Sequence, residues 1–100
     1  MLELQFKDAE EFEKYFFGID APKELIYKNI FEGVKEGLDN DLDTVTFAEI
    51  SFDDGTMVLL DSVRSEWKQN LENCINYFIE VENFELCAEM NEYLKLLEDE

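Results

Sequence analysis

Hydrophobic positions along the chain change their spacing several times, and each spacing predicts a different element. Leu2, Leu4 and Phe6 alternate with polar residues, which predicts a short strand with one buried face. A helix follows, capped by Asp8 and ended by Gly18, which is able to take the left-handed conformation beyond a helix C-terminus. The apolar positions of that helix are Phe12, Phe16 and Phe17.

A second helix is predicted to open at Asp20-Ala21-Pro22, because proline is tolerated in a first helical turn. Its apolar residues recur at spacings of three and four and therefore predict one core-facing stripe. They are Leu25, Ile26, Ile30, Phe31, Val34 and Leu38.

The middle of the chain predicts a β-hairpin. Residues 44–52 are β-branched and aromatic, residues 53–56 (Asp-Asp-Gly-Thr) form a strong turn signal, and residues 57–60 return as the second strand. The alternation slips between Phe47 and Ile50, which indicates a β-bulge there.

From Ser62 or Ser65 onward the pattern is helical and contains two apolar stripes. The first comprises Trp67, Leu71, Cys74, Ile75 and Phe78, and the second Phe84, Cys87, Met90, Leu94 and Leu97. Only residues 80–83 separate them, so we expect an antiparallel helical hairpin over residues 62–98. Residues 1–100 are thus predicted to form a single α+β domain. It comprises a small antiparallel sheet (a β-hairpin plus the N-terminal strand), two N-terminal helices and this hairpin.

The net charge of the chain limits the kinds of partner that it can bind. The 26 acidic and 8 basic residues give a net charge of −18, while 46% apolar residues suffice for a core. Such a field repels nucleic acid and anionic membranes, so a partner recognised electrostatically should be basic. The chain has no apolar run long enough for a membrane span and no basic, apolar start typical of a signal peptide. Cys74 and Cys87 are expected to be buried free thiols, which suits a cytoplasmic protein.

The usual signatures of catalysis and of metal binding do not appear in the sequence. There is no histidine, and the four glycines form no phosphate-binding loop, so we expect no enzyme activity, catalytic residue or cofactor. Asp39, Asp41 and Asp43 have the spacing that opens a calcium loop. Its sixth and twelfth positions are Thr44 and Ile50 in place of glycine and glutamate, so no metal site is predicted.

An acidic ridge is predicted along the last helix. On a helix over residues 82–97 the glutamates fall on one side, opposite the apolar stripe; they are Glu82, Glu85, Glu89 and Glu92. No basic residue lies between Lys68 and Lys95 to pair with them. The ridge is either a solvated face or a contact surface. Its carboxylates, about 5–6 Å apart, would also suit a nucleic-acid mimic that occupies a cationic groove.

The order of residues 71–90, continuing to Leu94 and Leu97, resembles the UVR motif. This helical hairpin occurs in the helicase and in the nuclease of excision repair, and also in adaptors of bacterial proteolysis. Residues 82–85 (Glu-Asn-Phe-Glu) resemble its turn and Cys87-Ala88 its pair of small residues, while Asn91-Glu92 replaces its Arg-Asp. The resemblance implies a hairpin used for protein contact, either by self-association or by docking on a similar hairpin.

The sequence therefore predicts a non-enzymatic acidic module or adaptor that binds another protein through its C-terminal hairpin. The partner should be basic or present a helical hairpin, and a homodimer is one form of this. The predicted contact residues are Tyr77, Glu82, Phe84, Glu85, Glu89, Glu92 and Tyr93. The alternative is a nucleic-acid mimic that inhibits a DNA- or RNA-binding protein, with no direct nucleic-acid or membrane binding in either case.

Overall fold

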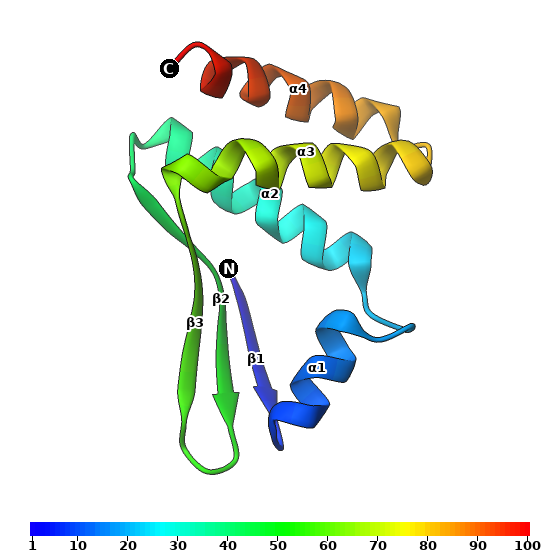
Figure 1. Ribbon diagram of the computed structural model, residues 1–100, viewed down its shortest axis with the longest axis vertical. Coiled ribbons are helices and arrows are strands. Elements are labelled where there is room, and N and C mark those ends of the chain that lie inside the picture. The colour runs from blue at the N-terminus through cyan, green and yellow to red at the C-terminus, as the bar shows by residue number, and fades with distance from the viewer.

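The computed structural model describes residues 1–100 as three strands and four helices (Figure 1). In chain order they are β1 (Leu2–Phe6), α1 (Ala9–Phe17), α2 (Lys23–Asp39), β2 (Thr44–Phe52), β3 (Met57–Val63), α3 (Arg64–Glu80) and α4 (Phe84–Glu98). The α+β class and the C-terminal helical pair predicted from the sequence are both confirmed.

The sheet is mixed, and the prediction of an antiparallel sheet was wrong for its first strand. The strand order is β1-β2-β3; β2 and β3 are antiparallel, but β1 runs parallel to β2, with Leu4 opposite Ile50. The chain between these two strands contains α1 and α2, and a connection of that length returns it to the end from which β1 started. Alternation predicts which residues share a face but leaves strand direction open.

The predicted β-bulge lies at Phe47, where the pairing between β2 and β3 shifts from Thr46 to Ala48. The extra residue lets Val45 and Ala48, three positions apart, both be buried on the same face of the sheet. The hairpin turn uses Gly55 at φ 90°, a conformation that glycine adopts without a steric penalty.

Several predicted boundaries shift by a few residues. Gly18 ends α1 at φ −76° and is not left-handed; its lack of a side chain matters because a Cβ would lie 2.3 Å from the carbonyl oxygen of Lys14. Pro22 is the N-cap of α2 and precedes its first turn. The return strand extends to Val63 because buried Ser62 still pairs with β2, and α3 begins only at Arg64.

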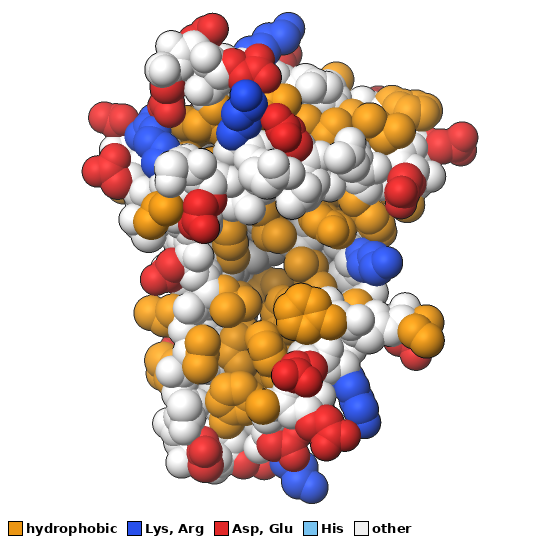
Figure 2. Space-filling view, in the orientation of Figure 1, with side chains coloured by type: hydrophobic (Ala, Val, Ile, Leu, Met, Phe, Trp, Pro, Cys, Tyr) orange, Lys and Arg blue, Asp and Glu red, His pale blue; other side chains and the backbone are white.

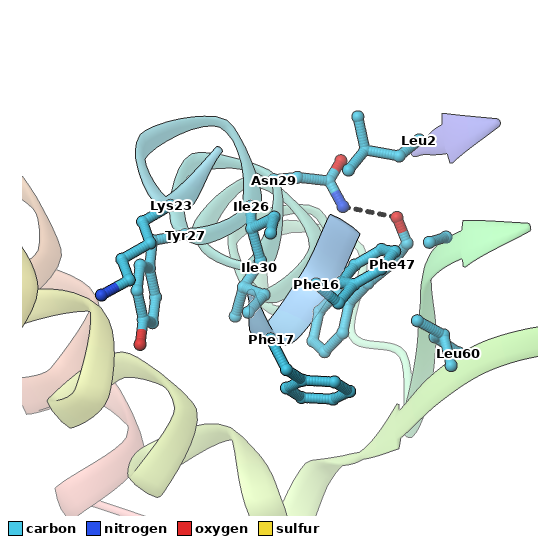
Figure 3. Close-up of a pocket in the computed structure, with 11 residues that line it drawn as sticks. Leu2, Phe16, Phe17, Lys23, Ile26, Tyr27, Asn29, Ile30, Phe47 and Leu60 are labelled. Carbon is cyan, nitrogen blue, oxygen red and sulfur yellow. Dashed lines mark hydrogen bonds between the residues drawn. The ribbon is translucent and has the colours of Figure 1, made fainter. Parts of the chain in front are cut away.

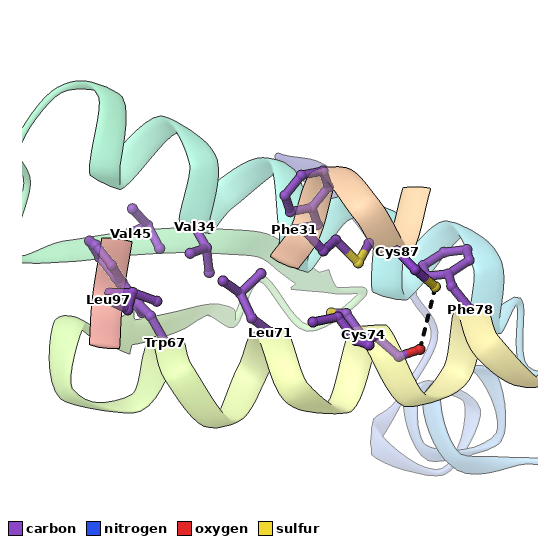
Figure 4. Packing of buried hydrophobic residues seen from close by; sticks show 11 residues of the cluster. Phe31, Val34, Val45, Trp67, Leu71, Cys74, Phe78, Cys87 and Leu97 are labelled. Atoms are coloured by element: carbon purple, nitrogen blue, oxygen red, sulfur yellow. Dashed lines mark hydrogen bonds between the residues drawn. The ribbon is translucent and has the colours of Figure 1, made fainter. Parts of the chain in front are cut away.

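Two separate hydrophobic clusters hold the fold together. The larger joins α2, α3 and α4 to the start of β2, and its 11 buried residues include Phe31, Trp67, Leu71, Phe78 and Met90 (Figure 4). In the smaller cluster only Phe6, Ala48 and Ile50 are buried, with residues of α1 packed around them.

Two glycines in α2 let this helix pack closely on the larger cluster. A Cβ at Gly33 would lie 2.5 Å from the ring of Phe47, and one at Gly37 would lie 2.5 Å from the ring of Trp67. A side chain at either position would therefore force the facing ring, or α2 itself, to shift. The larger cluster depends on this close approach.

Candidate protein-binding surface

The tight turn of the α3–α4 hairpin lies at the end of the helical pair opposite the C-terminus (Figure 1). The turn comprises residues 81–83, with Glu82 in the left-handed region at φ 60°. Asn83 closes it twice: its N–H donates to the carbonyl of Phe78 at 2.9 Å, and its side-chain oxygen accepts from the N–H of Leu86 at 3.4 Å. This last bond caps α4 and fixes the direction in which the helix leaves the turn.

Three of the predicted contact residues, Glu82, Phe84 and Glu85, lie together and exposed at this turn. Phe84 is 61% exposed, and Ile79 and Val81, at the end of α3 and in the turn, are 49% and 50% exposed. We call these three apolar residues, together with Glu80, Glu82 and Glu85, the turn patch. Figure 2 shows hydrophobic atoms next to acidic side chains at this end of the helical pair.

No cation neutralises the turn patch. The five ion pairs of the protein involve other carboxylates, those of Glu10, Glu24, Asp41, Glu89 and Glu100. The three glutamates of the turn patch therefore have no ion-pair partner. That combination of apolar side chains and unpaired carboxylates is the feature that the proposed function below builds on.

Glu89 and Tyr93 lie elsewhere, against α2. The Glu89 carboxylate accepts from Lys35 Nζ at 3.1 Å, and this hydrogen bond raises the pKa of Lys35. Tyr93 packs edge-on against Phe31 with ring centroids 5.8 Å apart, and its hydroxyl lies 3.4 Å from Asp39. Desolvation, followed by the Asp39 charge, raises the pKa of Tyr93. Both residues thus help to hold α4 on α2.

The other two predicted contact residues are also apart from the turn patch. Tyr77 is half-buried and stacks on Tyr27 of α2, with ring centroids 4.8 Å apart. Glu92 is exposed on α4 with no ion-pair partner. The acidic ridge is therefore not one continuous free surface, because Glu82 precedes the helix and Glu89 is paired. The sequence interval from Lys68 to Lys95 does lack cations, but Lys35 comes from a helix 54 residues away.

A second apolar surface, which the sequence did not predict, lies between α1 and α2 over the inner face of the sheet. It is a hollow of about 310 Å³, close to the lower limit for ligand pockets (Figure 3). Nine of its 11 lining residues are hydrophobic, among them Phe16, Phe17, Ile26, Phe47 and Leu60. Lys23 and Asn29 are the polar ones, and the Asn29 side-chain amide donates to the carbonyl of Phe47.

In the sequence, the consecutive pair Phe16-Phe17 is the feature that could have indicated this hollow. Neighbouring residues on a helix face different directions, so both rings cannot be buried under the same helix. Phe17 is 80% exposed, and no residue of α1 is fully buried. Figure 2 shows hydrophobic side chains gathered over the sheet and α1, around a depression in the surface.

The structure contains no arrangement typical of a metal centre or of a reactive thiol. No group of three or more His, Cys, Asp or Glu side chains is placed to hold a metal ion. Cys74 and Cys87 are free and buried, as predicted, and desolvation raises the pKa of Cys74 to about 12. None of the helices combines the length and apolar character that crossing a membrane requires.

No family model, curated protein or solved structure matches this chain. The resemblance of residues 71–97 to the UVR motif therefore stays a prediction that rests on the sequence alone.

Proposed function

We propose that this protein is a cytosolic, non-enzymatic interaction module that binds a basic protein through the turn patch. One observation carries the proposal: Ile79, Val81 and Phe84, which lie in or next to one tight turn, are each about half exposed or more, and three glutamates at the same turn have no ion-pair partner. Isolated exposed apolar residues are ordinary on a protein surface, whereas several of them gathered at one turn among charged residues favour an interaction site.

The charge of the protein supports a basic partner. With a net charge of −18, its field steers cationic surfaces toward it and repels anionic ones. The apolar residues then supply affinity once the partner excludes water from them. The resemblance to the UVR motif supports the same surface, because that motif implies a hairpin used for protein contact. A partner that presents a similar hairpin, including a second copy, would dock there with weaker dependence on salt.

A matched pair of substitutions on α4 tests the turn patch. Partners captured from the native cell would be identified, and the purified partner titrated against Phe84→Ser and Leu96→Ser. Phe84 and Leu96 are 61% and 55% exposed, near opposite ends of the helix. We expect Phe84→Ser to weaken binding at least about tenfold and Leu96→Ser to leave it unchanged. Equal losses for both variants would remove the turn patch as the contact.

A nucleic-acid mimic remains the alternative function, favoured by the number of free carboxylates. Five of the 26 acidic side chains are engaged in ion pairs, and the rest are spread over the whole molecule. A mimic predicts that double-stranded DNA or RNA competes for the partner at low salt, where electrostatic attraction is strongest. It also predicts equal effects of Glu85→Lys and Glu98→Lys, whereas the turn patch predicts a loss only for Glu85→Lys.

A further inference from the structure

The outer edge of β3 is open. This strand pairs with β2 on one side, and no strand pairs with its other side. Next to the turn, the N–H of Phe52 donates to the carbonyl of Thr56 at 2.9 Å. Because bonded and non-bonded pairs alternate along antiparallel strands, Val58 bonds to β2 while Met57 and Leu59 direct their N–H and C=O groups to the open edge.

Both faces of this edge are apolar. On the outer face Met57 and Leu59 are 58% and 53% exposed, and on the inner face Val58 is 41% exposed. Residues 57–60 (Met-Val-Leu-Leu) include no charge and no proline. Soluble proteins commonly protect an edge strand with lysine, proline or a covering segment, and none of these is present along residues 57–60. The edge is therefore open to another strand.

The open edge is continuous with the hollow. Leu60 is half-buried on the inner face of β3, and it lines the hollow opposite residues of α1 and α2. Figure 3 shows Leu60 and Phe17 beside the same space, although they come from elements far apart in the sequence. A chain lying along β3 would place every second side chain over this apolar space.

We propose that β3 and the hollow form one docking groove for an extended, basic peptide segment of a partner protein. The segment adds a fourth strand to the sheet, as in other cases of β-strand addition. Its inward apolar side chains enter the hollow, and its outward lysines or arginines face the acidic groups around the edge. These groups are Glu49, Asp53, Asp54 and Asp61. The groove is separate from the turn patch and does not depend on it.

Two other occupants fit the observations less well. A second copy of this chain would bring a further charge of −18 to the same edge, and the like charges repel. An amphipathic helix in the hollow would cover Val58 and Leu60 but leave Met57 and Leu59 exposed on the other face. A strand contacts both faces of the edge and uses its free backbone groups as well.

The synthetic peptide KVKFKVKFK is a direct probe, because its lysines and apolar residues alternate with the period of a strand. We expect it to bind at low salt and to slow amide hydrogen exchange at Met57 and Leu59 at least about tenfold. The same peptide with alternate backbone N-methyl groups keeps all its side chains but loses edge hydrogen bonds, and should bind at least about tenfold more weakly. The acidic peptide EVEFEVEFE should not bind.

Variants of the protein separate the groove from general charge effects. Leu59→Lys protects the edge, and Asn91→Lys makes the same change of charge at an exposed position of α4, away from the sheet. Phe17→Ala removes a wall of the hollow, and Ile19→Ala alters a side chain that is 100% exposed outside it. We expect at least about tenfold weaker binding of KVKFKVKFK for Leu59→Lys and Phe17→Ala, and less than about twofold for the two controls. Circular dichroism and Trp67 fluorescence would confirm that each variant is folded.

Several results would overturn the groove. Equal binding by Leu59→Lys and Asn91→Lys, or no protection of the Met57 and Leu59 amides, would show that the peptide binds elsewhere. A molecular mass that doubles at low salt and returns to that of the monomer in Leu59→Lys would make a second copy the occupant. Circular dichroism showing that the bound peptide is helical would exclude strand addition. A loss of peptide binding in Phe84→Ser would show that the peptide binds at the turn patch.

Discussion

The helical half and the sheet half of this protein bury their apolar residues to different extents. In the helical half, α2, α3 and α4 enclose a core with side chains such as Trp67, Phe78 and Met90 at 0% exposure. In the sheet half, α1 covers one part of one face, and the smaller cluster there has only three buried residues, Phe6, Ala48 and Ile50. Along its principal axes the molecule measures 44 × 30 × 16 Å, so much of it is only about two layers thick.

This difference in burial indicates where a partner is expected to bind. A region that buries its apolar side chains internally has little left to offer a partner. The helical half exposes three large apolar side chains at the turn patch and, apart from them, Leu25 and Leu96. The sheet half leaves Phe17, Met57 and Leu59 more than half exposed, although each belongs to a regular element. Exposed apolar residues weaken the stability of that half but provide surface for a partner.

The strongest test of the comparison replaces one phenylalanine from each half. We expect Phe78→Ala, at a site with 0% exposure, to lower the free energy of unfolding by about 3–5 kcal/mol. Phe17→Ala, at 80% exposure, should change it by about 0.5 kcal/mol or less. Urea denaturation followed by the fluorescence of Trp67, the single tryptophan, measures both values. Similar losses for the two variants would mean that α1 is packed as tightly as α3.

A smaller effect is expected at the start of α1. Asp8 caps this helix by accepting a hydrogen bond from the N–H of Glu11 at 3.0 Å. We expect Asp8→Ala to lower the free energy of local opening by about 1 kcal/mol, because one helix-end donor loses its partner. Amide hydrogen exchange should therefore become faster in α1 and stay unchanged in α3. The matched control is Asn83→Ala at the N-cap of α4, and faster exchange throughout the chain in Asp8→Ala would contradict independent opening of α1.

The smallest expected effect at neutral pH is that of the ionisation of Cys74 on the stability of the protein. Burial raises its pKa from 9.0 to about 12, so the folded protein keeps the thiol protonated at a pH where the unfolded chain ionises it. The contribution to stability is fully present below pH 9 and is lost as the pH rises toward 12. We expect Cys74→Ala to show a shallower loss of stability over that range in urea denaturation. An identical slope in the variant and the parent protein would show that this thiol does not titrate on unfolding.

The local pattern was sufficient for most of the elements. Apolar alternation at residues 2–6, the turn at residues 53–56 and the helical stripes from Trp67 onward all correspond to observed elements, because each depends on neighbours within a few positions. Boundaries were less well predicted where distant contacts decide them. Ser62 extends β3 beyond the predicted end, since it is buried at the junction with α3 and bonds to Glu66 and Asn70.

The candidate contact surface was predicted only in part, for the same reason. Glu82, Phe84 and Glu85 lie together because the turn itself is local in the sequence. Glu89 and Tyr93 were assigned to the same ridge, and only their packing against α2 shows that they hold helices together. A period of about 100° per residue gives the face of a helix but not what covers that face.

The sequence by itself determined the α+β class, the order of the helices and strands, and the acidity on which the proposal of a basic partner rests. The tertiary structure decided that β1 is parallel to β2, that the acidic ridge is divided, and that a hollow opens beside the unpaired edge of β3. The physical reason is the range of the interactions: periodicity and turn chemistry act over a few residues. Ion pairs, strand neighbours and uncovered faces depend instead on segments that the fold brings together from opposite ends of the chain.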